Sequence, residues 1–370
     1  MMIWIRISIT FSVKHRVITF HFCVIVEDAD DSVYTFNGHS DELFTVACSP
    51  IDEFLAATGG KDDKGFLWKI GLSDPAFELQ GHGDTVSTIA FSYDGKLLAS
   101  GSFDGLVQVW DTLSGGLLGT LEGSGGGIEW LRWHPRGHLI LAGSEDSNVW
   151  LWNADTRAWL NTFSGHASTV TCGDFTPDGK LICTGSDDAS LRIWNPKTGE
   201  SIHTVRGHPY HTDGLTCLSI TSDSTIAITG SKDGSVHMVN IVTGKVVSSL
   251  NAHTNSIECI GLSASYPWAA TGSMDQKLII WDLQRSYVRF TCDHDEGVTC
   301  LAWLGTSRYV ATGCIDGKVR VWDSLSGSCL KTFSGHNDII QSLVVSKDGK
   351  ALVSCSSDGT ARVFQISEFQ

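Results

Sequence analysis

Short apolar runs alternate with turn sequences along almost the whole chain, and one phrase of this pattern recurs from residue 38 nearly to the end. The phrase begins with Gly-His, continues with an apolar run, a turn and Gly-Ser-x-Asp, and closes on Trp-Asp or a related pair. The copy from Gly81 to Asp111, GHGDTVSTIAFSYDGKLLASGSFDGLVQVWD, is the clearest. Turns such as YDGK at 93–96 separate the runs, and no helical period competes. The pattern therefore predicts short β-strands joined by tight turns.

The copies are evenly spaced. Eight of them follow one another at a period of about 42 residues, and in each an aspartate stands six residues before the closing position. The closing positions are Trp68, Trp110, Trp152, Trp194, Val239, Trp281, Trp322 and Phe364. The aspartates are Asp62, Asp104, Asp146, Asp188, Asp233, Asp275, Asp316 and Asp358. The initiating histidines, absent from the third copy, are His39, His82, His166, His208, His253, His294 and His336. Such a period predicts one repeat architecture rather than several separate domains.

Composition and charge narrow the class of protein. Hydrophobic residues make up 42% and charged residues 18% of the 370 positions, with a mean hydropathy of +0.02. These values argue against a disordered chain and against a multi-span membrane protein. Acidic residues outnumber basic ones 41 to 26, so the formal net charge is -15. A surface of that sign repels a phosphate backbone and attracts basic partners, so we expect a protein partner and no direct nucleic-acid ligand.

The cysteines and the first residues add several expectations. The 11 cysteines include no C-x-x-C pair, and the aspartates form no calcium loop, so no metal or cofactor is expected. Arg6 and the KHR cluster at 14–16 interrupt the apolar start, so neither a signal peptide nor membrane insertion is expected. The expected location is the cytoplasm, with the nucleus as an alternative. Residues 1–31 are interpreted as an N-terminal extension, either disordered or an artefact of the gene model, because they carry no repeat signal.

The recurrent phrase resembles the WD-repeat family over roughly residues 32 to 367. That resemblance implies an all-β fold, an eight-bladed β-propeller whose four-stranded blades surround a central channel. In this family the strand before each Gly-His belongs to the preceding blade, so the last copy is one strand short. Ser32 to Phe36 are expected to supply the missing strand and to close the ring. Residues 32–370 are thus predicted to form a single propeller, and we expect a monomer.

The recurrent polar residues have two interpretations. Ser100, His82 and Asp104 contain the three groups of a hydrolytic triad. An active site is built once, whereas this trio recurs in most copies, so no enzyme activity is expected. The family resemblance implies instead that the His, the Asp, a strand Ser or Thr and the Trp form a buried hydrogen-bond chain in each blade. Copy three, with the glycine run at 123–127, and copies five and eight, which do not close on Trp, are expected to have incomplete chains and looser blades.

A narrower resemblance lies in four segments. They are GGKDDKGFLWKI at 59–70, IEWLRWHP at 128–135, LAGSEDSNVWLWN at 141–153 and SKDGKALVSCSSDGTARVF at 346–364. These segments resemble the angio-associated migratory cell protein family. That resemblance implies a binding platform without enzyme activity. The family includes a cytosolic chaperone of one newly made large-subunit ribosomal protein, and its animal members have been connected with cell migration and signalling.

The resemblance also implies which face binds. Three positions in each copy are expected there: the two that flank the first apolar residue after Gly-His, and the one before the recurrent Asp. The candidate partner-binding residues are Glu42, Phe44, Phe103, Glu129, Glu145, Asp187, Glu258 and Met274. Lys61, Lys232, Ile315 and Ile339 occupy equivalent positions, and an insertion at 209–212 lengthens the loop of copy five. An acidic rim around apolar anchors suits a basic peptide. The alternative is that a chain of this net charge carries acids on every face.

Three functions remain open at this point. The first is a scaffold that chaperones a basic client such as a large-subunit ribosomal protein. The second is a signalling or cell-migration scaffold, which the sequence does not separate from the first. The third is a substrate adaptor of a ubiquitin ligase. The Trp-Asp-x-Arg typical of such adaptors is missed by one residue in WDLQR at 281–285, which counts against the third.

Overall fold

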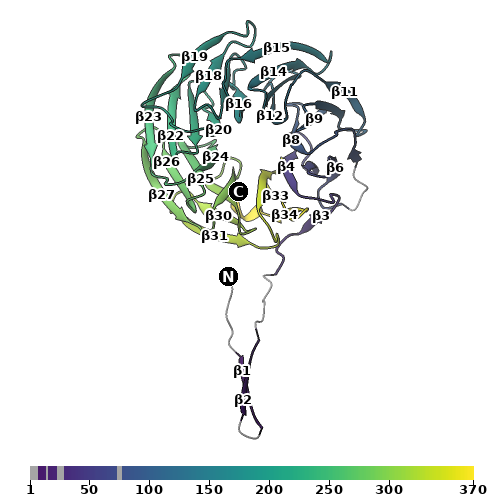
Figure 1. Cartoon of the computed structure of the whole chain (residues 1–370), viewed down its shortest axis with the longest axis vertical. Coiled ribbons are helices and arrows are strands. Elements are labelled where there is room, and N and C mark those ends of the chain that lie inside the picture. Colours follow the sequence, from purple (N-terminus) through teal and green to yellow (C-terminus); the bar gives the residue numbers. More distant parts are fainter. Residues whose placement is uncertain (1–6, 14–15, 23–28, 73–76) are drawn as a thin grey trace.

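The chain forms a ring of β-sheets (Figure 1). The computed structural model describes residues 7–13, 16–22, 29–72 and 77–370. From residue 29 onward the described strands form eight four-stranded antiparallel sheets, or blades, arranged around a central axis. The one helix in the described part of the chain is a short 3-10 turn, η1 (Ser367–Phe369). The predicted all-β, eight-bladed propeller is therefore confirmed.

The blades follow the chain in order. Blade one contains β4 (Leu43–Cys48), β5 (Leu55–Gly60), β6 (Gly65–Lys69) and β7 (Phe77–Leu79). Blade two contains β8 (Val86–Phe91), β9 (Leu97–Ser102), β10 (Val107–Asp111) and β11 (Leu117–Leu121). Blade three contains β12 (Ile128–Trp133), β13 (Leu139–Ser144), β14 (Asn148–Asn153) and β15 (Ala158–Ser164). Blade four contains β16 (Cys172–Phe175), β17 (Ile182–Gly185), β18 (Leu191–Trp194) and β19 (Ser201–Val205).

The second half of the ring continues in the same way. Blade five contains β20 (Leu215–Ile220), β21 (Ile226–Ser231), β22 (Ser235–Asn240) and β23 (Lys245–Asn251). Blade six contains β24 (Ile257–Leu262), β25 (Trp268–Ser273), β26 (Lys277–Asp282) and β27 (Tyr287–Asp293). Blade seven contains β28 (Val298–Trp303), β29 (Tyr309–Cys314), β30 (Val319–Asp323) and β31 (Ser328–Phe333). Blade eight contains β32 (Ile340–Val345), β33 (Ala351–Ser356) and β34 (Ala361–Gln365), together with β3 (Tyr34–Phe36) from the start of the chain.

Strand β3 closes the ring. It pairs antiparallel with β34, with Tyr34 opposite Val363 and Phe36 opposite Ala361. The prediction that Ser32 to Phe36 complete the last blade is therefore confirmed. The Phe36 ring also stacks on Trp68 of blade one, with ring centroids 4.8 Å apart. The closing strand thus removes the edge of blade eight and contributes to the packing between the last blade and the first.

Neighbouring blades pack face to face through side chains that alternate along their strands. Val107 and Val109 of blade two lie in one buried cluster with Ile128, Leu131 and Ile140 of blade three. The glycine near the end of each second strand permits this approach. A Cβ on Gly101 would lie 2.7 Å from Cγ2 of Ile128, closer than carbon atoms can pack, so any larger residue would push the blades apart.

The described part of the extension before the propeller contains two strands, and the expectation of disorder stays a prediction. Strands β1 (Ile7–Val13) and β2 (Arg16–Phe22) pair antiparallel in a two-stranded sheet of their own, with Ile7 opposite Phe22 and Val13 opposite Arg16. Both segments alternate β-branched or aromatic residues with polar ones, a pattern that favours strands. The suggestion of a gene-model artefact stays a prediction, and residues 1–6, 14–15 and 23–28 lie outside the described residues.

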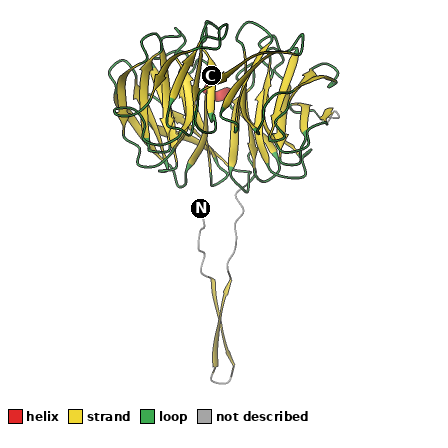
Figure 2. Ribbon diagram, turned by 45° about the horizontal axis from the view of Figure 1, so that its top comes forward, coloured by secondary structure: helices red, strands yellow, loops and turns green. Residues whose placement is uncertain are grey.

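The propeller has two different ends (Figure 2). One end carries the loops that join the outermost strand of a blade to the innermost strand of the next, with the turns between its second and third strands; we call it the Gly-His face. The opposite face carries the remaining loops. Within the described residues, no helix has the length and apolar character needed to cross a bilayer.

Candidate functional site

The recurrent polar residues form a hydrogen-bond chain inside the blades. In blade two, Nδ1 of His82 lies 3.1 Å from Oδ2 of Asp104, and Nε2 of His82 lies 2.8 Å from Oγ of Ser100. Nε1 of Trp110 donates to the same Ser100 hydroxyl at 2.9 Å. A carboxylate only accepts, so Nδ1 donates to Asp104, and Nε2 of the neutral ring accepts from Ser100.

This chain is structural in its geometry. Ser100 is only 1% exposed, so its hydroxyl has no path to a substrate. Burial lowers the pKa of His82, against the opposing charge of Asp104, so the ring stays neutral. The same four-part chain occurs in blades four and six, through His166, Thr184, Asp188 and Trp194, and through His253, Thr271, Asp275 and Trp281. An unmade buried hydrogen bond costs about 1 to 3 kcal/mol, which is what each chain avoids.

In blade five the predicted histidine is wrong. His208 is exposed, whereas His211 places Nε2 2.9 Å from Oγ1 of Thr229 and Nδ1 2.8 Å from Oγ of Ser235. The Ser235 hydroxyl donates to Oδ1 of Asp233, which lies 3.5 Å from Nδ1 of His211. The insertion at 209–212 moves the ring three positions along the chain. Tyr210 donates its hydroxyl to Thr229 at 2.9 Å, the bond that the Trp makes in other blades. The expectation of an incomplete network in blade five is therefore also wrong.

Blade three replaces the missing histidine by other groups. Ser124 donates to Oγ of Ser144 at 2.7 Å, and Nε1 of Trp150 donates to Oδ2 of Asp146 at 3.0 Å. Trp152, predicted to join the network, donates instead to the carbonyl of Glu122 at 3.1 Å. The network of blade three differs from the others, as expected. Its aspartate still accepts a hydrogen bond from a tryptophan, Trp150, which stands two residues before the closing Trp152.

In blade seven the predicted pair of His294 and Asp316 is not formed. Nη2 of Arg320 lies 2.6 Å from Oδ2 of Asp316, and Nδ1 of His294 donates to the carbonyl of Cys292 at 3.1 Å. The guanidinium takes the carboxylate because it is a permanent charge, whereas burial, with Arg320 nearby, lowers the pKa of His294 to about 4. Thr312 still joins His294 at 2.9 Å and Trp322 at 3.1 Å.

Blades one and eight lack the donation from the closing residue. In blade one, His39 lies 2.8 Å from Asp62 and 3.0 Å from Thr58, but the buried Nε1 of Trp68 has no hydrogen-bond partner. In blade eight, His336 lies 2.9 Å from Asp358 and 2.7 Å from Ser354. The closing residue, Phe364, has no side-chain donor. Whether blades three, five and eight are looser stays a prediction.

The Gly-His face is built on a repeated backbone bond. The residue before each recurrent Asp donates its N–H to the carbonyl of the residue that precedes the first apolar position of the same blade. The pairs run from Lys61 to Glu42, Phe103 to Thr85, Glu145 to Gly127, Asp187 to Thr169, Lys232 to Gly214, Met274 to Ser256, Ile315 to Gly297 and Ser357 to Ile339, at 2.8 to 3.0 Å. The bond sets two of the predicted rim positions side by side in every blade.

The third predicted position falls on a β-bulge at the start of the innermost strand. Four blades carry a hydroxyl there that donates to the inner strand of the next blade, as Ser87 does to the carbonyl of Ile128 at 2.5 Å. The other three are Thr171, Thr216 and Thr299. Phe44, Glu129 and Glu258 replace this hydroxyl in blades one, three and six, and all three are half-buried. These side chains are therefore available for contacts other than the bond between blades.

Three of the predicted acids lie within electrostatic range of one another. Burial raises the pKa of Glu129, and the charges of Glu145 and Asp187 raise it further. The three come from β12, from the turn after β13 and from the turn after β17, so two blades contribute. A cation placed among them would relieve this repulsion.

Two of the predicted acids already have lysine partners. Oε1 of Glu42 lies 3.0 Å from Nζ of Lys61, and Oδ1 of Asp187 lies 2.7 Å from Nζ of Lys232. All four side chains are at least 30% exposed, so water screens both pairs. Glu258 acts on Lys232 through its charge as well, so this lysine lies between two acids.

Two glycines, Gly127 and Gly297, each let a group of apolar or acidic side chains come together on the Gly-His face. A Cβ on Gly127 would lie 2.9 Å from Cδ1 of Phe103 and 3.0 Å from Oε2 of Glu145, so this glycine lets an aromatic ring and a carboxylate meet. A Cβ on Gly297 would likewise lie 2.8 Å from Sδ of Met274 and 3.0 Å from Cδ1 of Ile315. The first group adjoins the acids of blades three and four, and the second lies on blades six and seven.

A cavity also opens on the opposite face, between blades five and six. It encloses about 660 Å³ and is lined mainly by apolar groups such as Ile220, Leu262 and the stacked rings of Tyr266 and Trp268, 4.2 Å apart. The lining includes one carboxylate, Asp223. Within the described ranges, no group of three or more His, Cys, Asp or Glu side chains is arranged to hold a metal ion.

Comparison with known proteins places this geometry among relatives. The family model described as WD domain, G-beta repeat, matches residues 30–69, 73–111, 115–153, 158–195, 199–240, 244–282, 285–323 and 327–365. The angio-associated migratory cell protein of Homo sapiens is 44% identical over 85 residues, 23% of this chain and 20% of that protein. An uncharacterized WD repeat-containing protein of Schizosaccharomyces pombe is 39% identical over 70 residues, 19% of this chain and 18% of that protein. The chain thus aligns with at most 20% of the length of these relatives.

Solved structures resemble the whole ring. Sqt1 of Chaetomium thermophilum, crystallised bound to the N-terminus of the ribosomal protein L10, has a TM-score of 0.85 and 23% identity, covering 91% of this chain and 100% of that one. Sqt1 of Saccharomyces cerevisiae has a TM-score of 0.83 and 22% identity, covering 92% of this chain and 100% of that one. At this identity the similarity establishes the common fold.

Proposed function

Because the chain belongs to the WD-repeat family, we propose that it is a non-enzymatic platform that binds a basic segment of a newly made protein on its Gly-His face. The client class that fits best is a large-subunit ribosomal protein, and the role is that of a chaperone or assembly factor. Two findings support this choice: the net charge of -15, and the fold shared with Sqt1, whose crystal structure holds the N-terminus of a ribosomal protein. The proposal places the work in the cytoplasm.

The group formed by Phe103, Glu129, Glu145 and Asp187 is the observation that carries the proposal. Glu129 is half-buried among like charges, which raises its pKa. A guanidinium or ammonium group arriving there removes the repulsion and pairs with the half-buried carboxylate of Glu129 and with the more exposed carboxylates of Glu145 and Asp187. Phe103 adds an apolar surface, 37% exposed, directly beside Glu145. Arginine suits such a site, because its planar group pairs with carboxylates and stacks on rings.

The remaining predicted residues complete the binding face in this proposal. Met274 offers an apolar contact on the far side of the ring. On blade one, Phe44 offers an apolar contact and Glu42 a carboxylate. Anchors of this kind determine how long a complex lasts, since their burial is lost on dissociation. The exposed acids act at longer range and determine how fast a basic client arrives.

The test reverses the charges of Glu129, Glu145 and Asp187 to Lys in one variant. Affinity purification from cytosol at low salt, followed by mass spectrometry, should recover one basic ribosomal protein with the wild-type chain. The variant should bind that client more slowly, and its association rate should depend less on salt, because the attraction at range is gone. A matched control carries Lys at Glu53, Glu200 and Glu368, which are exposed and outside the Gly-His face.

The apolar half of the proposal has its own measurement. Phe103→Ala should speed dissociation of the captured client and leave its association rate nearly unchanged. Normal client binding by the triple reversal at low salt would show that the acids are only a solvated surface. Recovery of a ligase complex or a membrane receptor in place of a ribosomal protein would overturn the client class.

A further inference from the structure

Two junctions between neighbouring blades, which we call grooves, carry near copies of one arrangement of residues. The sequence TFSGH occurs at 162–166, between blades three and four, and again at 332–336, between blades seven and eight. The glycine has φ +154° in both. Each glycine lies against an arginine of the following blade: a Cβ on Gly165 would be 2.7 Å from Nη1 of Arg192, and one on Gly335 would be 3.0 Å from Nη1 of Arg362. The two grooves therefore present the same loop and the same guanidinium.

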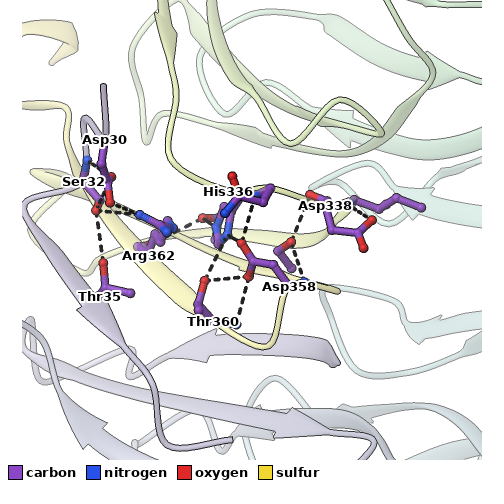
Figure 3. Close-up of polar contacts among 12 residues, drawn as sticks. Asp30, Ser32, Thr35, His336, Asp338, Asp358, Thr360 and Arg362 are labelled. Atoms are coloured by element: carbon purple, nitrogen blue, oxygen red, sulfur yellow. Dashed lines mark hydrogen bonds and ion pairs between the residues drawn. The ribbon is translucent and has the colours of Figure 1, made fainter. Parts of the chain in front are cut away.

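The groove between blades seven and eight is filled by an acidic segment of the chain itself (Figure 3). The carboxylate of Asp30 forms an ion pair with Nη1 of Arg362, which also donates to Oγ of Ser32 at 3.3 Å. Asp31 adds a two-way contact, because its N–H donates to the carbonyl of Ser334 at 2.9 Å and its Oδ2 accepts from the N–H of Ser334 at 2.8 Å. The guanidinium of Arg362 thus binds the carboxylate of Asp30, and the backbone of Ser334 binds that of Asp31.

The groove between blades three and four holds no such segment. Among the described residues Arg192 makes no ion pair and no hydrogen bond, and its guanidinium lies over the ring of Trp194, 5.5 Å from the centroid. Its Nε is buried without a partner, as is that of Arg362. Its nearest acid, Asp188, is engaged with His166 in the blade network, as Asp358 is with His336 in blade eight. The guanidinium of Arg192 is therefore poised as that of Arg362 is, without the carboxylate that Arg362 holds.

A second cation lies close to Arg192. Burial lowers the pKa of Arg192, the charge of Asp188 acts the other way, and the charge of Arg206 lowers the pKa, so the two guanidinium groups repel each other. Residue 37, the equivalent of Arg206 in blade eight, is an asparagine. The equivalent of Arg192 in blade seven, Arg320, is neutralised by Asp316 and Asp295. In a chain of net charge -15, Arg192 and Arg206 thus form a local basic site.

We propose that the groove between blades three and four binds an acidic peptide segment of a partner protein, with two consecutive carboxylates placed as Asp30 and Asp31 are in the twin groove. Arg192 takes the first carboxylate, the loop at Ser164 takes the second, and Arg206 adds attraction at the end of the groove. The occupant is a partner and not the same segment of a second copy, because that segment is already held in the twin groove of its own propeller. The groove lies on the Gly-His loops at 164–166 and 206–208, and its residues differ from the group of Phe103, Glu129, Glu145 and Asp187 that takes the basic client.

The test measures binding of a labelled peptide to the full chain. The probe, Ala-Asp-Asp-Ser-Val-Tyr, copies residues 29–34, and its affinity is read by fluorescence anisotropy at low salt. Arg192→Gln should weaken binding by about tenfold or more, because a charge-assisted contact is lost. Arg206→Gln should weaken it less, and Arg192→Lys should fall between Arg192→Gln and wild type. Arg136→Gln, the same charge change at an exposed loop of blade three, serves as the control and should bind normally.

Three results would overturn the proposal. The first is a peptide that binds Arg192→Gln as well as wild type, which would place it in the twin groove or elsewhere. The second is a control peptide with Asn in place of both Asp residues that binds equally well, since carboxylates would then be irrelevant. The third is displacement of the peptide by an equal concentration of inorganic phosphate, which would indicate a simple anion site. Normal capture of the basic client by Arg192→Gln would show that the two proposed sites bind their partners independently of each other.

Discussion

At the scale of single residues, buried polar groups keep a partner even where the repeat departs from its pattern. The side chain of Val239 in blade five has no N–H to replace that of the closing Trp. Tyr210 donates its hydroxyl to Thr229 in its place, from a different loop. In blade three Trp150 satisfies the aspartate that lacks a histidine. The requirement is for a donor at a point in space, and more than one side chain can meet it because the cost of leaving the acceptor unpaired is about 1 to 3 kcal/mol.

A pair of substitutions in blade five tests this assignment. His211→Ala should lower the free energy of unfolding by about 1 to 3 kcal/mol, because Thr229 and Asp233 lose a buried partner. His208→Ala should change it by less than about 0.5 kcal/mol, because the ring is exposed. Chemical denaturation of both variants measures the difference. Equal losses would show that His208 shares the network.

Glu129 makes a second prediction at this scale. Its pKa is raised by burial and by its acidic neighbours, so the folded state holds the proton more tightly than the unfolded state does. Ionisation of Glu129 therefore costs stability, and that cost appears as pH rises through the raised pKa. Glu129→Gln should raise the melting temperature at pH 7, by an amount that disappears near pH 4. Glu53→Gln, an exposed control, should do neither, and a Gln variant less stable at pH 7 would contradict the assignment.

At the scale of the element, the closing strand β3 determines whether blade eight has a complete sheet. It is only three residues long, yet it joins β34 by backbone pairing and places Phe36 on Trp68. The acidic segment before it is held by Arg362 and Ser334, which ties the start of the chain to two blades. Most of the contribution of the N-terminal region to propeller stability should therefore lie between residues 29 and 37.

Two truncations check that contribution. Deleting residues 1–26 should hardly change the melting temperature, because β3 and Asp30 to Ser32 are retained. Deleting residues 1–37 should lower it sharply, since the burial of Phe36 alone is worth about 1.5 to 3 kcal/mol and the edge of β34 becomes exposed. Differential scanning calorimetry of the two proteins gives the comparison. Equal effects, or a seven-bladed ring in an experimental structure, would refute the closure.

At the scale of the whole molecule, the ring of buried histidines makes stability depend on pH. Burial lowers the pKa of His39, His82, His211, His253 and His294, to about 4 for His211 and His294. Their neutral form is built into the blades. As pH falls below the ordinary histidine pKa of about 6.5, the unfolded chain takes up protons that the folded ring refuses.

The expected result is a loss of stability as pH falls from 7 to 4.5, spread over the window between the ordinary and the lowered pKa values. His138 opposes the trend, because Asp155 and Asp94 raise its pKa although burial acts the other way, but it is one group against six, since burial lowers the pKa of His237 as well. Melting temperatures recorded across this range provide the measurement. A stability that stays constant between pH 7 and pH 5 would show that the blade histidines are not buried as described.

Many residues of the proposed binding face could be predicted from the sequence, but the ion pairs that they form could not. The repeat places Glu129, Glu145 and Asp187 at equivalent rim positions, and the structure brings these three within electrostatic range. Nothing in the repeat pattern indicates that Asp187 is paired with Lys232 of the next blade, 45 residues away. The correct histidine of blade five was accessible in principle, since a spacing of 22 residues before the aspartate, as between His82 and Asp104, leads to His211.

The sequence by itself determined the all-β class, the number of blades and the strand that closes the ring, because alternation, turn residues and the polar phrase are local signals repeated in every copy. Tertiary structure alone decided which side chain completes each network, which acids are neutralised and which arginine lacks a carboxylate. These depend on groups from different blades meeting in space, as Arg362 meets Asp30 across the closed ring. A local pattern carries no information about such meetings, since they follow from the geometry of the closed ring.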